Sequence, residues 1–243
     1  MHLGTSASPR LKARLAGLCY LATIGVGAFD HIFVGGRLIV AGDAAATARN
    51  ILASEQLYRL AFTLDLIPVY IMVTLLFYDL FKPVSPGLSR LAAFSSLVGG
   101  AVGSTIGLLQ LAPLTVLSGS RALSAFDAGQ LQGLATLLLG LHEVGFDISL
   151  VFFGFYCLLI GWLILGSTFL PRFVGVLMAL GGLAYMTFSF AAFASPPAAS
   201  ILAPYALMLG TLGEASLTLW LLAVGLNASR WREQAAASRL GPP

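Results

Sequence analysis

The sequence predicts an all-α membrane protein, a bundle of six transmembrane helices. Of its 243 residues, 58% are hydrophobic and only 9% are charged, and the mean hydropathy is +0.92. A chain of this composition has too little polar surface to cover a water-soluble globule. Six stretches have roughly the 20 apolar residues that a helix needs to cross a bilayer. They are Leu15–Phe33, Leu60–Phe81, Leu91–Leu111, Phe146–Leu165, Phe173–Phe193 and Tyr205–Leu226.

The basic residues predict the orientation of the bundle, because cytoplasmic loops of membrane proteins carry the excess of Lys and Arg. With a cytoplasmic N-terminus, nine basic residues fall inside and four outside. We therefore expect one multi-pass membrane domain over residues 1–243, with both termini and a basic tail at 227–243 in the cytoplasm. The net charge of +3 is small, and the cations form no stripe suited to nucleic acid. Membrane lipid is the expected partner, and the oligomeric state stays open.

The polar segment after the first span predicts a helix on the outer surface. Asp43 suits an N-cap, since its side chain can accept a hydrogen bond from a free N–H of the first turn. We expect the helix Asp43–Leu57 to lie along the membrane and to cover the bundle. The residues that share its apolar face are Ala44, Ala48, Ile51 and Leu52.

Glycines recur on one face of the third span, and others lie in the helical segment before the fourth span. Gly99, Gly103 and Gly107 repeat every four residues, a small-residue pattern that lets two helices approach closely in lipid. Before the fourth span, a helical pattern begins at Asp127 and runs through Gly140, too far from the end of that span for one straight crossing. We therefore expect a short interfacial helix there, with a bend at Gly140 or Gly145.

Acidic residues in three spans are the main functional signal. Asp65, Asp147 and Glu214 lie in the outer halves of the second, fourth and sixth spans. One Asp at the centre of a membrane helix costs about 2.5–3.5 kcal/mol on insertion scales, so these side chains should face one another or a water-filled cavity. Together with His142 they are the candidate catalytic residues of a polar pocket that opens outward.

Further polar residues near the outer ends are candidate ligand-binding groups. They are Asp30, His31, Gln110 and Glu143. Simpler interpretations stay open: Asp30 could mark the membrane boundary and pair with Arg37, and the deeper acids could only hold helices together through hydrogen bonds.

A metal site is a further open alternative, and the cofactor is unknown. His142, Asp147, Asp65 and Glu214, with a contribution from His31, could form a mixed site for zinc, which activates water in many hydrolases. The spacing does not require this, because the chain contains no His-Glu-x-x-His motif and no histidine triplet.

Several motifs are distinctive as a set: Gly42–Asp43, Leu80–Val84, His142 with Gly145–Phe146, Val151–Gly154, Leu170–Leu177, and Glu214 ahead of Leu219–Leu222. Together they resemble one family of bacterial membrane proteins, known as domain of unknown function 4386. The resemblance covers about Leu15 to Gly225 and implies a multi-pass protein of the bacterial inner membrane, without an established activity to carry over.

The leading hypothesis is a protein that binds a lipid or another lipophilic small molecule in the pocket of acids and histidine. Whether it also performs acid–base chemistry, and so whether it is an enzyme, stays open. The alternatives are a proton-coupled carrier, a structural or accessory membrane subunit, and a zinc-dependent membrane hydrolase.

Overall fold

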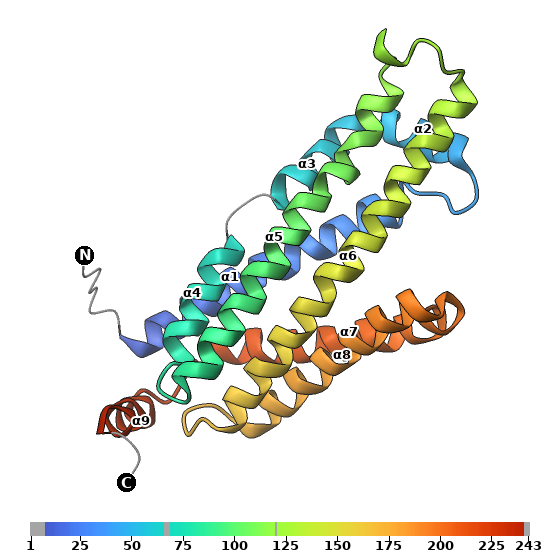
Figure 1. Cartoon of the computed structure of the whole chain (residues 1–243). Coiled ribbons are helices and arrows are strands. Elements are labelled where there is room, and N and C mark those ends of the chain that lie inside the picture. Colours follow the sequence, from blue (N-terminus) through green and yellow to red (C-terminus); the bar gives the residue numbers. More distant parts are fainter. Residues whose placement is uncertain (1–7, 66–68, 120, 241–243) are drawn as a thin grey trace. The chain divides into compact units, whose positions relative to one another are not determined.

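The computed structural model describes residues 8–65, 69–119 and 121–240, and its regular elements are helices (Figure 1). Six of the described stretches are long and apolar enough to cross a membrane, which confirms the predicted all-α membrane fold. The elements are α1 (Pro9–Phe29), η1 (Asp30–Gly35), α2 (Ala44–Ala53), α3 (Glu55–Asp65), α4 (Val69–Phe81), α5 (Pro86–Leu117), η2 (Arg121–Leu123), α6 (Ala128–Leu165), α7 (Arg172–Ala194), α8 (Pro196–Ala223) and α9 (Ala228–Leu240).

The chain forms two compact units. Unit 1 contains the chain up to Ala22, Val69–Gly99 and the chain from Leu150 onward, and unit 2 contains the remaining two segments, residues 23–68 and 100–149. Three of the boundaries fall inside helices α1, α5 and α6. A boundary inside a helix has no Pro/Gly-rich or polar linker of the kind that separates domains. The single membrane domain over residues 1–243 stays a prediction.

Unit 1 is built around an apolar core with aromatic contacts. Tyr20 of α1 meets Phe77 of α4 edge to face, with ring centroids 5.6 Å apart. Phe81 stacks on Phe169 from the loop before α7, at 6.2 Å. Helices α7 and α8 lie side by side in this unit (Figure 1). The largest fully buried side chains of this core include Tyr20, Tyr156, Phe77, Phe81, Leu163, Met178 and Leu217.

Glycines bring the helices of unit 1 into backbone contact. A Cβ atom at Gly161 of α6 would lie 2.6 Å from the backbone nitrogen of Ala179 in α7, and one at Gly213 of α8 would lie 2.7 Å from the carbonyl oxygen of Leu177. In lipid the hydrophobic effect does not drive helices together, so close van der Waals packing of this kind stabilises their association.

Unit 2 confirms the predicted N-cap of the helix that follows the first span. The Asp43 carboxylate accepts a hydrogen bond from the backbone N–H of Ala46 at 2.8 Å, and α2 follows directly. Ala48 and Ile51 of the predicted apolar face are buried, whereas Leu52 of the same face is 45% exposed. The helix is shorter than expected, because it ends at Ala53 and Leu57 belongs to α3.

The predicted small-residue face of the third span also packs in unit 2. A Cβ atom at Gly103 would lie 3.3 Å from the Ser149 hydroxyl group of α6, and one at Gly107 would lie 3.3 Å from the Phe62 ring of α3. These two glycines therefore admit neighbouring helices as the pattern predicts.

The prediction of a separate interfacial helix before the fourth span was wrong. Helix α6 runs without interruption over 38 residues (Figure 1). Gly140 and Gly145 keep negative φ angles, and Gly145 packs against Ile106 of α5. A glycine inside a helix costs only about 1 kcal/mol relative to alanine, so it does not by itself end the helix.

The second predicted span is described in two parts, α3 and α4, which belong to units 2 and 1 respectively. Its central residues 66–68 lie outside the described residues. Helix α3 already begins at Glu55, five residues before the predicted start of the span.

Candidate polar centre in unit 2

A hydrogen bond between two predicted residues joins α5 to the end of the first span. Nε2 of Gln110 donates to Oδ1 of Asp30 at 2.7 Å. Gln110 is only 3% exposed, and an amide buried without a partner would be costly. Asp30 opens the π-helical turn η1, and π-helical turns next to α-helices are frequent at functional sites. The structure therefore brings these two candidate ligand-binding residues together.

Tyr58 attaches α3 to the same place. Its hydroxyl group donates a hydrogen bond to the backbone carbonyl oxygen of Gln110, and the side chain is fully buried. Sequence reasoning missed this residue. The available signal was a tyrosine ahead of an apolar run, since a buried phenol usually finds a hydrogen-bond partner.

His142 and Asp65 are the other predicted residues near Asp30. Both lie close enough to Asp30 for their charges to interact with it. His142 is partly buried on α6, whereas Asp65, the last residue of α3, is exposed. We call Asp30, Tyr58, Asp65, Gln110 and His142 the Asp30 centre.

The other predicted residues of unit 2 lie around this centre. His31 is exposed, and its charge interacts with that of Asp30. On α6, Glu143 is exposed and Asp147 is partly buried, and the two carboxyl groups interact across one helical turn as their spacing predicts.

The simpler interpretation of Asp30 as a partner of Arg37 finds no support. The guanidinium group of Arg37 lies over the ring of Phe33, 4.7 Å from its centroid. This cation–π contact occupies the arginine within η1 and the turn that follows it, while Gln110 occupies Oδ1 of the aspartate.

Glu214 belongs to unit 1 and has polar neighbours of its own. The Tyr185 hydroxyl group of α7 donates to its Oε1 at 2.8 Å, and Tyr20 also interacts with this carboxyl group. Gly210, one turn before Glu214 on α8, makes room for the tyrosine, because a Cβ atom there would overlap the phenol ring. The two units thus each contain one of the predicted acids in a hydrogen bond.

Other hydroxyl groups are buried in unit 1. Among the residues that the structure describes, none bonds the side-chain oxygens of Tyr156, Ser189 or Thr218. A buried hydroxyl group without a partner costs about 1–3 kcal/mol.

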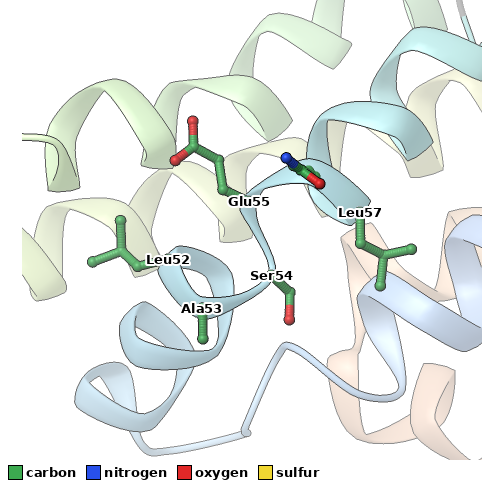
Figure 2. Close-up of a pocket in the computed structure, with 6 residues that line it drawn as sticks. Leu52, Ala53, Ser54, Glu55 and Leu57 are labelled. Atoms are coloured by element: carbon green, nitrogen blue, oxygen red, sulfur yellow. The ribbon is translucent and has the colours of Figure 1, made fainter.

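A hollow of about 490 Å³ lies elsewhere in unit 2, at the junction between α2 and α3. Figure 2 shows that Leu52 and Leu57 point to opposite sides of this junction and that Ser54 points away from Glu55. Six consecutive residues, 52–57, line the hollow. It is a recess beside one short, continuous segment of the chain, and its lining includes no residue of the Asp30 centre.

The zinc hypothesis receives no geometric support. Within the described ranges, no three His, Cys, Asp or Glu side chains gather closely enough to hold a metal ion.

The fold and the polar groups inside its spans define the class: a multi-pass helical membrane protein. The family model described as domain of unknown function (DUF4386) matches residues 15–225, so the chain belongs to this family. No curated protein and no solved structure matches the chain.

Proposed function

We propose that the protein binds the polar group of a lipid or another lipophilic small molecule at the Asp30 centre. The hydrogen bond between Gln110 and Asp30 carries this proposal. It holds one carboxyl oxygen of an aspartate within a stretch able to span a membrane, and this aspartate interacts electrostatically with a partly buried histidine, His142. Ionisable groups in such positions are expensive and are functional candidates by default.

The proposed roles follow from the bonding of each group. Gln110 fixes the orientation of Asp30 through Oδ1, so Oδ2 is the oxygen that a donor group of the ligand would meet. His142 can exchange a proton with a ligand held there, as positioned imidazoles do in acid–base catalysis. Apolar residues of the surrounding helices would contact the rest of a lipophilic ligand.

A bacterial inner membrane with both termini in the cytoplasm is part of the proposal. The support for cytoplasmic termini is the distribution of nine cations against four along the sequence.

The experiment compares molecules that copurify with the full-length protein. Lipophilic compounds extracted from wild type and from Asp30→Asn are quantified by mass spectrometry, with thermal unfolding measured in parallel. Glu55→Gln is the control, since Glu55 of the same unit is an exposed carboxylate paired with Arg59. We expect Asp30→Asn to lose a retained compound about tenfold or more, because a hydrogen bond to a charged group contributes about 1.5–3 kcal/mol.

The alternatives give different results. A purely structural centre predicts that Asp30→Asn lowers the unfolding temperature while every compound is retained as in wild type. Equal retention in wild type, Asp30→Asn and Glu55→Gln would therefore contradict ligand binding at this site.

A further inference from the structure

Unit 1 has a hollow of about 430 Å³ where three parts of the chain meet. The start of α1, the loop before α7, and the segment from the end of α8 into α9 all line it. A volume of this size falls within the range of small-molecule sites, about 300–1,000 Å³.

Two arginines supply the charge of the hollow. Arg10 comes from the start of α1 and Arg230 from the start of α9, and both are exposed. Within the described ranges, neither forms an ion pair with a carboxylate, whereas Lys12 is bound to Asp79 at 2.7 Å. Both guanidinium groups are thus available to an anion.

The position of Arg230 is fixed by its neighbours. Its backbone N–H donates to Oδ1 of Asn227 at 3.2 Å, and its Nη1 donates to the carbonyl oxygen of Thr168 at 3.4 Å. Gln234 of α9 binds both the backbone N–H and the hydroxyl group of Thr168. Trp231 anchors the same helix by donating from Nε1 to the carbonyl oxygen of Leu80 at 2.9 Å. Arg230 therefore lies on a helix, α9, that hydrogen bonds hold against the rest of unit 1.

Part of the remaining wall is apolar, beside the polar residues Thr168 and Asn227. Phe169 and Leu170 are buried, and Trp220 packs edge to face on Phe173 with centroids 5.6 Å apart. Val224, which also lines the hollow, is 57% exposed. Tryptophan is enriched at membrane–water interfaces, where one end of the side chain meets lipid and the other meets water.

We propose that this hollow binds the headgroup of an anionic phospholipid. Arg10 and Arg230 would hold the phosphate group, and the acyl chains would follow Trp220 and Val224. Charge complementarity and the mixed lining carry the assignment, because basic pockets between transmembrane helices bind anionic lipid headgroups. A soluble phosphate would not use the apolar wall.

The test titrates the full-length protein in detergent with phosphatidylglycerol or phosphatidylcholine and measures the bound lipid by native mass spectrometry. The variants are Arg10→Gln and Arg230→Gln. Arg239→Gln is the matched control, since Arg239 is an exposed cation near the other end of α9. Inorganic phosphate in large excess is added as a competitor.

We expect wild type to bind phosphatidylglycerol more tightly than phosphatidylcholine. Each of the two site variants should weaken phosphatidylglycerol binding about fivefold, the effect of one cation near an anionic lipid surface, while Arg239→Gln leaves binding unchanged. Equal affinity for the two lipids would overturn the proposal, and this arm needs no variant to fold. Equal losses in all three variants, or displacement of the lipid by inorganic phosphate, would also overturn it.

Discussion

At the scale of single residues, two tyrosines in unit 1 differ in whether their hydroxyl groups form a hydrogen bond. Tyr185 donates to Glu214, whereas no group in the described part of the chain bonds the hydroxyl group of Tyr156. Removing a hydrogen-bonded hydroxyl group leaves its partner without that bond. Removing a buried hydroxyl group that has no bond removes the free-energy cost of burying it.

The same substitution should therefore have different effects at the two positions. We expect Tyr185→Phe to reduce the free energy of unfolding by about 0.5–1.5 kcal/mol, and Tyr156→Phe to leave it unchanged or raise it. Reversible thermal or denaturant unfolding in detergent measures both. A larger loss for Tyr156→Phe than for Tyr185→Phe would contradict the hydrogen bonding described for this unit.

Residue identity predicted the candidates of the Asp30 centre better than it predicted their partners. Asp30, Gln110 and His142 are conspicuous because polar side chains in apolar runs are costly. Tyr58 was missed because a tyrosine can also rest its ring in lipid and its hydroxyl group in water, so its presence does not indicate a bond. Grouping Glu214 with the other acids stays a prediction, and within unit 1 this carboxylate accepts a hydrogen bond from Tyr185.

At the scale of elements, α6 has glycines in two environments. Among the described residues, no heavy atom apart from the chain neighbours and the backbone of the same helix lies within 4 Å of a Cβ atom placed at Gly140. A Cβ atom placed at Gly161 would clash with the backbone of α7 at Gly175 and Ala179. The sequence shows glycine in both places, and only the neighbouring helix distinguishes them.

Alanine substitutions should separate these environments. We expect Gly161→Ala to destabilise the protein by about 1–3 kcal/mol, the usual cost of forcing extra volume into a packed interior. Gly140→Ala should stabilise it by up to about 1 kcal/mol, because alanine favours the helix. The measurement is the unfolding temperature of both variants side by side. Similar shifts for the two would show that α6 does not pack closely on α7 at Gly161.

The wrong prediction of an interfacial helix also arose because the sequence does not show what packs against the glycines of α6. A run that is long for one crossing suggested a bend, yet a helix can exceed the thickness of the membrane by tilting or by extending beyond it. Sequence length alone does not choose between these solutions, since the contact of Gly145 with Ile106 depends on the fold.

At the scale of the whole molecule, the six spans were predictable because they depend on composition and length. The division into two units was not predictable. Three of its boundaries fall inside helices that continue through them, so the sequence contains no linker at these points. The candidate site was therefore only partly predictable: its residue types stand out in the sequence, but their distribution between the units depends on packing.

An even number of spans places both termini on one side of the membrane. We expect cysteines introduced at Ser8 and Ser238 to react with a membrane-impermeant maleimide only after the cells are permeabilised. A cysteine at Ser124, an exposed position between α5 and α6, should react in intact cells and serves as the control. Labelling of Ser8 and Ser238 from opposite sides would refute the six-span topology.

The proposed function requires Asp30 and His142 to act on one ligand. Its most direct test is a double-mutant comparison of the retained lipophilic compound in Asp30→Asn, His142→Gln and the combined variant, each checked for folding by its unfolding temperature. Groups that share one site are non-additive, so we predict that both single variants lose the compound and that the double variant loses little more. Retention at the wild-type level in the folded double variant would contradict the claim.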